Sequence, residues 1–170
     1  MSPFKPSQRP ALTPENALAR DMAWCARQER STGEVLDKLR SWGVAPGTSR
    51  RIVSRLEVEQ YVDDRRYAHA YCHDKFQFNG WGRVKISLML RTKGIDGELI
   101  AEALDDIDYD EYQEKARRIL AAKQATLHDR DPRTLRASLA RFAASRGFEP
   151  DVFFPIIDQL MEGQGDENED

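Results

Sequence analysis

The sequence of 170 residues predicts an all-α protein made of three tandem three-helix repeats that form an elongated, curved helical array. Three observations lead to this fold class. A pattern of about 50 residues recurs three times, apolar side chains within each copy are spaced by three or four residues, and alternating β-branched runs are absent. Repeats of this kind bury their apolar faces mainly against their neighbours, so we expect the copies to stack.

The repeat is organised around three glycines, Gly43, Gly94 and Gly147, spaced by 51 and then 53 residues. Six positions are apolar in every copy: eight and four residues before the glycine, and one, nine, ten and thirteen residues after it. Residues one helical turn apart share a face, so a helix is predicted on both sides of each glycine. The glycine itself suits the residue after a helix end, where a positive φ is unfavourable with a Cβ.

Helix starts are marked by proline and by capping side chains. Pro46, Gly97 and Pro150 align at the first position of the helix after each glycine, where proline loses no hydrogen bond. Short polar side chains that can accept from the first turn precede the other helices. These N-cap candidates are Thr13, Ser31 (with Glu34), Asp63, Asp96, Asp108 (with Glu111) and Asp131. The predicted helices span 14–28, 32–42 and 46–60, then 63–78, 82–93 and 97–106, then 109–126, 132–146 and 150–161.

Two helices carry further expectations. On a helical wheel Val84 and Leu88 lie nearly opposite Ile86 and Leu90, so we expect helix 82–93 to be covered on both sides. Pro155 lies inside the last helix and is expected to remove one hydrogen bond and to kink or delay that helix.

Five segments follow from this reading. They are a flexible arm (1–12), the three repeats (13–60, 61–107 and 108–161) and an acidic disordered tail (162–170).

The formal net charge of −3 argues against a polycation that simply coats nucleic acid, but it hides an uneven distribution. Residues 158–170 carry six acids and no Lys or Arg, so the rest of the chain is net positive. No stretch approaches the roughly 18 apolar residues of a membrane helix, and no signal-peptide core opens the sequence, which predicts a cytoplasmic protein.

Candidate chemistry is sparse. His69 and His73 lie one helical turn apart with Cys72 between them, but a full ligand set for a metal is missing. Cys25 and Cys72 are most simply small buried residues, and the glycines of the NGWGR segment lack the spacing of a phosphate-binding loop. We therefore predict no catalytic residues, no metal and no cofactor.

Charge segregation is the clearer signal. Residues 65–95 hold seven basic residues and one acid, whereas 96–106 hold five acids and no Lys or Arg. Clustered arginines favour phosphates or carboxylates, so a nucleic acid or an acidic protein groove is a sensible partner, and a solvated helix face is the simpler alternative. A second arginine row decorates the third repeat: Arg130, Arg133, Arg136, Arg141 and Arg146.

Several segments in one register resemble the RecX family of regulators of the RecA recombinase. The middle repeat carries the strongest similarity, and the resemblance extends over residues 14–161. Trp81 and its loop, Pro155 and the acidic tail depart from the pattern. The matching segments are Tyr61–Ala68 (YVDDRRYA) with Tyr71, Gly82–Ile86 (GRVKI) with Leu90, Lys93–Ile95 (KGI), and Ile100 with Ala103 and Leu104.

The resemblance implies a non-enzymatic monomer that binds the groove of the RecA filament on single-stranded DNA. It would restrain filament extension, ATP hydrolysis and strand exchange in homologous recombination and the SOS response, with weak DNA binding of its own. The alternative is a small helical DNA-binding protein that acts independently of RecA. The residues expected to contact the filament or DNA are Arg50, Arg51, Arg55, Arg65, Arg66, Arg83, Lys85, Arg91 and Lys93.

Overall fold

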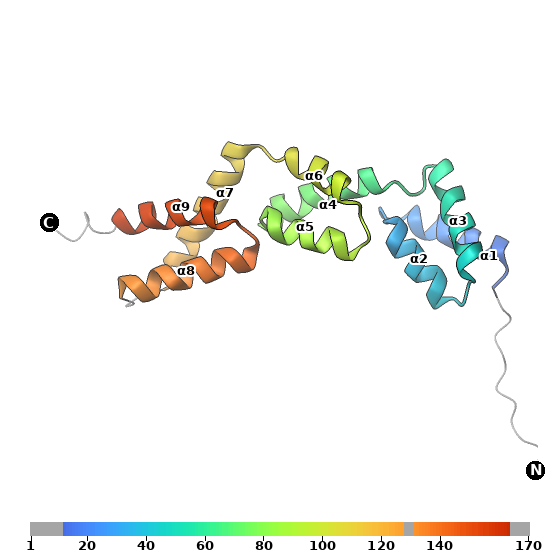
Figure 1. Ribbon diagram of the computed structural model, residues 1–170, viewed down its shortest axis with the longest axis horizontal. Coiled ribbons are helices and arrows are strands. Elements are labelled where there is room, and N and C mark those ends of the chain that lie inside the picture. Colours follow the sequence, from blue (N-terminus) through green and yellow to red (C-terminus); the bar gives the residue numbers. More distant parts are fainter. Residues whose placement is uncertain (1–11, 128–130, 164–170) are drawn as a thin grey trace, which may run out of the picture. The chain divides into compact units, whose positions relative to one another are not determined.

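The computed structural model describes residues 12–127 and 131–163, and in these ranges all regular structure is helical (Figure 1). The all-α prediction is confirmed, and each helix end lies within three residues of its predicted position. The predicted arm and tail fall almost entirely outside the described residues. The helices are α1 (Pro14–Cys25), α2 (Thr32–Ser41), α3 (Pro46–Val58), α4 (Asp64–Gln77), α5 (Arg83–Thr92), α6 (Gly97–Asp105), α7 (Tyr109–Gln124), α8 (Pro132–Arg146) and α9 (Pro150–Glu162).

The predicted N-caps are all present. Ser31 and Glu34 form a complete capping box, in which each side chain accepts from the other's backbone N–H at 3.1 Å. Such a box satisfies two donors that the first turn of a helix leaves unpaired. The remaining predicted caps each accept one backbone N–H from the following turn, and they are Thr13, Asp63, Asp96, Asp108 and Asp131.

The three glycines adopt the predicted left-handed conformation, with φ of 77° at Gly43, 77° at Gly94 and 89° at Gly147. In each turn the apolar residue after the glycine donates its N–H to the carbonyl four residues before the glycine. At the first turn this bond runs from Val44 to Leu39 at 3.1 Å. The apolar positions of the repeat are therefore also the positions that close each helix end.

The expected second cover of α5 is wrong, and so is the delay expected for the last helix. Val84 and Leu88 are 53% and 59% exposed, so nothing in the described part of the chain covers the outer face of α5. Helix α9 begins at Pro150 as predicted and runs without a break past Pro155, so no delay occurs. Pro155 has no N–H and therefore removes one helix hydrogen bond, as expected. Pro155 is exposed on α9, while Phe153 and Ile156 are buried.

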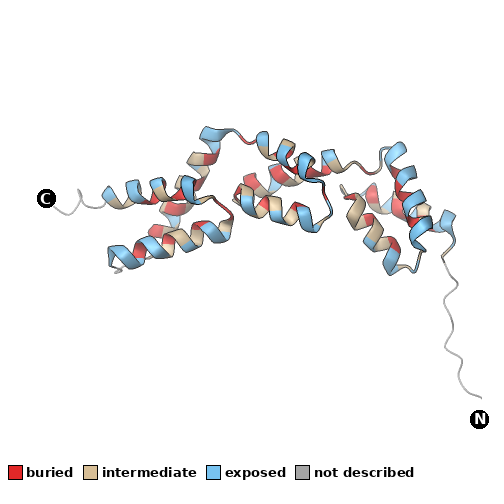
Figure 2. Cartoon of the chain, in the orientation of Figure 1, coloured by how far each residue is buried: buried red, intermediate tan, exposed pale blue. Residues whose placement is uncertain are grey.

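The chain forms two compact units, residues 1–67 and 68–170, and the boundary between them falls within α4. In unit 1 the core is formed by α1–α3, with Leu39 and Leu56 fully buried. The carboxylate of Asp64 accepts from the Thr32 backbone N–H at 2.8 Å and its hydroxyl at 2.6 Å, which fixes the start of α4 to α2. Buried residues colour the inner faces of these helices in Figure 2.

Unit 2 contains the rest of α4 and helices α5–α9. Tyr112 is fully buried at its centre, with its ring centroid 5.8 Å from that of Phe76 and 5.2 Å from that of Phe148. The Tyr112 hydroxyl accepts from the Arg83 backbone N–H at 2.9 Å and donates to Glu149 at 2.5 Å. Burial raises the pKa of this phenol, so it stays a neutral hydrogen-bonding group.

The start of α5 is held against the α8–α9 turn by backbone hydrogen bonds. The N–H of Gly82 donates to the Arg146 carbonyl at 2.8 Å, and the N–H of Val84 donates to the Gly147 carbonyl at 3.0 Å. We call this contact, formed by Gly82, Val84, Arg146 and Gly147, the glycine interface. Its partners come from separate three-helix segments, so it links the start of α5 to the α8–α9 turn within unit 2.

Candidate functional site

The nine predicted basic residues divide between the two units, five in unit 1 and four in unit 2. In unit 1, Arg50, Arg51 and Arg55 are exposed on α3. Arg51 donates to the Thr48 hydroxyl at 3.3 Å, and Arg55 forms an ion pair with Glu59. Arg51 and Arg55 also line a cavity of about 390 Å³ between α1 and α3.

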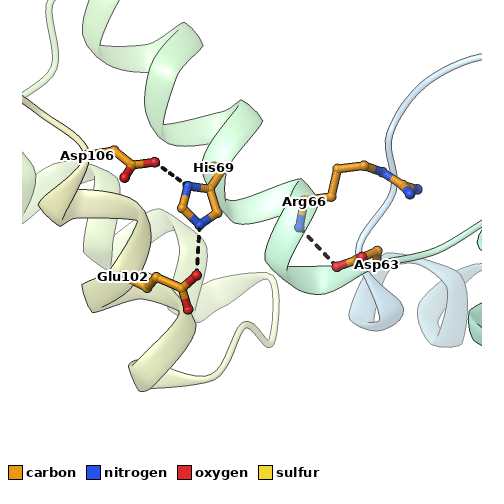
Figure 3. Close-up of polar contacts among 5 residues, drawn as sticks. All are labelled: Asp63, Arg66, His69, Glu102 and Asp106. Carbon is orange, nitrogen blue, oxygen red and sulfur yellow. Dashed lines mark hydrogen bonds and ion pairs between the residues drawn. The ribbon is translucent and has the colours of Figure 1, made fainter.

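The first turn of α4 supplies Arg65 and Arg66, both exposed. The Arg66 guanidinium lies 2.6 Å from the Glu29 carboxylate and donates to the Gln60 carbonyl at 3.3 Å. Its backbone N–H donates to the capping Asp63, as Figure 3 shows. Arg66 therefore ties the start of α4 to the α1–α2 connection, a role that the charge pattern does not indicate.

In unit 2, three lysines surround two half-buried aromatic rings. The Lys85 and Lys75 ammonium groups lie 4.4 Å and 5.0 Å from the Trp81 ring centroid. Lys75 and Lys93 lie 5.3 Å and 5.8 Å from the ring centroid of Tyr71. These distances are those of cation–π contacts, which hold the ammonium groups at the protein surface. We call Tyr71, Lys75, Trp81, Lys85 and Lys93 the lysine–aromatic cluster.

Sequence reasoning placed Lys85 and Lys93 in the candidate site but not Tyr71, Lys75 or Trp81. The signal was present, because aromatic residues and lysines are interspersed between residues 71 and 93. The predicted helix ends imply the turn between α4 and α5, but only the structure shows that this turn brings the side chains together.

The outer face of α5 presents Val84, Leu88 and Arg91, which follow one another by one helical turn. The Arg91 side chain makes no hydrogen bond or ion pair with any residue that the structure describes. We call these three residues the exposed α5 face.

Arg83 points the other way. Its guanidinium donates to the Ile107 carbonyl at 3.2 Å and lies 4.1 Å from the Tyr112 ring centroid. The side chain is half-buried, so Arg83 supports the interior of unit 2 and contributes less to an exterior contact than its neighbours on α5.

The acidic stretch 96–106 is partly used inside unit 2. The two ring nitrogens of His69 lie 2.6 Å from Asp106 and 3.4 Å from Glu102 (Figure 3). Cys72 is buried, which raises the pKa of its thiol to about 11, and His73 is exposed beside Asp74. Within residues 12–127 and 131–163, no three His, Cys, Asp or Glu side chains come together in a way that could hold a metal ion.

The second arginine row does not form one continuous surface. Arg136 pairs with Asp158 at 2.8 Å, and Arg146 donates to the Asn79 carbonyl at 3.1 Å. Arg133 and Arg141 are exposed on α8, and Arg130 lies outside the described residues. None of the described helices is both long and apolar enough to cross a membrane.

Comparison with known proteins decides the family. Residues 63–104 match the model of the second three-helix domain of RecX, and residues 110–157 match that of its third three-helix domain. The chain belongs to the RecX family. The matched RecX domains correspond to α4–α6 and α7–α9, and the first of them contains the whole lysine–aromatic cluster.

Individual RecX proteins extend the similarity into unit 1. The regulatory protein RecX of Streptomyces lividans is 26% identical over 162 residues, which cover 92% of this chain and 85% of the relative. That of Bacillus licheniformis is 39% identical over 87 residues, 51% of this chain and 33% of the relative. The crystal structure of RecX from Lactobacillus salivarius superposes with a TM-score of 0.77 at 26% identity, over 86% of this chain and 96% of that one.

Proposed function

We propose that this protein regulates the RecA recombinase by binding the RecA filament on single-stranded DNA. Binding would restrain filament extension, ATP hydrolysis and strand exchange. The proposal is supported by the two RecX domains matched at 63–104 and 110–157 and by relatives named regulatory protein RecX.

The exposed α5 face is the main structural support for this proposal. Val84 and Leu88 expose more than half of their surface beside Arg91, whose charge is not paired within the described residues. Apolar side chains next to an arginine are typical of a surface that contacts another protein. A surface that only neutralises DNA phosphates has no use for Val84 and Leu88, so the face favours a protein partner with acidic groups.

The lysine–aromatic cluster adds positive charge in the same domain. Lys85 and Lys93 are part of it, and with Arg91 they form the contact that we propose in unit 2. In unit 1 the proposed contact residues are Arg50, Arg51, Arg55 and Arg65. Arg66 and Arg83 differ from these residues because their partners, Glu29 and Ile107, lie far away along the chain, so they would act by keeping their surroundings in place.

The test is a titration into RecA filaments, with ATPase rate and DNA occupancy measured together. The double variant Lys85→Glu/Arg91→Glu should require at least about tenfold more protein for half-inhibition, because two attractive contacts become repulsive. The matched control is Arg133→Glu/Arg141→Glu, which makes the same change in net charge on exposed positions of α8. Equal inhibition by the two variants, with helical content preserved in both, contradicts the proposal.

A second variant separates regulation of RecA from independent DNA binding. Leu88→Ser should weaken inhibition of RecA and leave affinity for a bare oligonucleotide unchanged, since it removes no charge. Inhibition that follows bare-DNA affinity across salt concentrations, and that Leu88→Ser does not alter, would instead favour a protein acting on DNA alone.

A further inference from the structure

Unit 1 contains a cavity between α1 and α2 that lies outside both matched RecX domains. Its volume is about 270 Å³. We call it the tryptophan pocket, and its lining residues are Arg20, Ala23, Trp24, Arg27, Lys38 and Trp42.

Lysine and arginine groups lie against both indoles. The Lys38 ammonium is 5.5 Å from the Trp24 ring centroid and 5.6 Å from that of Trp42, so it sits between the two rings. The Arg20 guanidinium lies 5.8 Å from the Trp42 centroid. Arg30, which does not line the cavity, lies 4.2 Å from the Trp24 centroid and helps to hold that ring.

The charge of the pocket is one-sided. Three cations, Arg20, Arg27 and Lys38, line it, and no carboxylate does. Across the described ranges none of these three side chains forms an ion pair or a hydrogen bond. On the same helix as Lys38, but outside the pocket, Arg40 is paired with Asp37 at 2.8 Å. Lys38 interacts electrostatically with Asp21, which is buried in α1 and does not line the pocket.

We propose that the tryptophan pocket binds single-stranded DNA, with one unstacked base against Trp24 or Trp42 and the adjoining phosphates on Arg20, Arg27 and Lys38. Aromatic side chains that stack bases, combined with cations that follow the backbone, are the usual components of a single-strand site. The cavity is slightly smaller than the roughly 300 Å³ at which drug-sized pockets begin, which suits one base. An acidic peptide would use the cations but would supply no flat ring to stack on either indole.

This site extends the proposed function, because it gives unit 1 its own contact with the DNA strand. It is nevertheless independent of that function in its test, which uses no RecA. If the protein did not regulate RecA, the pocket could still bind DNA in this test. If the pocket did not bind DNA, inhibition of RecA through the exposed α5 face would still be measured in the RecA titration.

The chain has three tryptophans, so the full-length variant Trp81→Phe leaves only Trp24 and Trp42 as fluorophores. Titration with an oligothymidylate at low salt should quench their emission, because a base stacks on an indole. An abasic oligonucleotide of the same length supplies the phosphates alone, and oligoglutamate supplies an acidic peptide. Equal quenching by either of these, or no quenching by the oligothymidylate, overturns the proposal.

Two substitutions in the Trp81→Phe chain locate the site. Trp42→Leu should raise the dissociation constant of the oligothymidylate read from Trp24 about tenfold, the usual effect of removing one stacking partner. Lys38→Gln should raise it several-fold and flatten its salt dependence. Arg40→Gln, a charge loss on the same helix outside the pocket, is the matched control and should change neither quantity. An effect of Arg40→Gln equal to that of Lys38→Gln contradicts the assignment, and Lys38→Gln keeps the test valid if Trp42→Leu fails to fold.

Discussion

Gly43 in unit 1 and Gly147 in unit 2 occupy the same position of the repeat and have different surroundings. Both have a positive φ, and both are followed by a residue that closes the preceding helix at 3.1 Å. A methyl group added to Gly43 would meet nothing within 4 Å, whereas one added to Gly147 would lie 2.3 Å from the Cβ of Lys85. The repeat therefore specifies the backbone of the turn, and one copy has acquired a packing role as well.

The largest expected effect comes from Gly147→Ala. The substitution combines a left-handed alanine with a clash against α5, so it should lower the free energy of unfolding of unit 2 by about 3–4 kcal/mol. Gly43→Ala introduces only the strained φ and should cost about 1 kcal/mol in unit 1. Denaturant titration followed by circular dichroism measures both. Equal losses of unfolding free energy for the two substitutions would contradict a packing role for Gly147.

Gly82→Ala isolates the packing component. Its φ of −82° is suitable for any residue, but a Cβ there would lie 2.3 Å from the Gly147 carbonyl oxygen. We expect a loss of about 2 kcal/mol, entirely from displacement of the glycine interface. Gly47→Ala is the control, since a Cβ at Gly47 meets nothing within 4 Å. A harmless Gly82→Ala would mean that the α8–α9 turn can move away from α5 without cost.

Tyr112→Phe tests the hydrogen bonds next to that interface. It removes the hydroxyl that accepts from Arg83 and donates to Glu149, so it should cost about 1–3 kcal/mol. Tyr109→Phe makes the same change three residues earlier on α7, where the ring is 61% exposed, and should cost almost nothing. Unfolding of a chain in which Trp81 is the only tryptophan reports these effects in unit 2. Similar costs for the two substitutions would contradict a special role for Tyr112.

Unit 1 contains a buried acidic side chain, so its free energy of unfolding should depend on pH. Asp21 is fully buried, neither carboxylate oxygen has a hydrogen-bond partner in the described residues, and burial raises its pKa from 3.8 to about 6. The folded state therefore holds this proton more tightly than the unfolded state. Its contribution to stability is complete below about pH 4, falls by roughly 3 kcal/mol as pH rises through the folded-state pKa, and is constant above about pH 7.

The measurement compares the Trp81→Phe chain with the same chain carrying Asp21→Asn, by denaturant titration between pH 4 and 7. The difference in unfolding free energy between the two should change over that interval. The control is Asp37→Asn, which replaces an exposed carboxylate on α2. A difference that is constant with pH for Asp21→Asn would show that the buried carboxylate does not titrate in this range.

The helices and their caps could be predicted because the interactions that define them are local. Ser31 caps the residue three positions later, and Gly43 ends the helix that immediately precedes it, so a short stretch of sequence contains both partners. The exposed α5 face could not be predicted. An apolar residue opposite the buried side of a helix implies a cover, and the pattern does not say whether that cover belongs to the same chain.

Contacts between distant residues account for the other differences. Arg83 and Arg66 look like surface cations in the sequence, but the Ile107 carbonyl and the Glu29 carboxylate hold them. The tryptophan pocket was missed for a related reason. Trp24 and Lys38 are on different helices, and their shared cavity depends on how α1 packs against α2. The composition of a segment gives the charge of each helix. It does not show which side chains of that helix contact neighbouring helices.

The glycine interface also has a consequence for synthesis on the ribosome. Gly82 provides no side-chain cap for α5, whereas Ser31 caps α2 and Asp131 caps α8. The carbonyls that accept from Gly82 and Val84 belong to residues 146 and 147, which are translated more than 60 residues later. Because domains generally fold from the N-terminus as they emerge, the start of α5 should fray on the nascent chain until the α8–α9 turn has been made. A ribosome stalled before that turn would display α5 with its first turn open to proteases and chaperones.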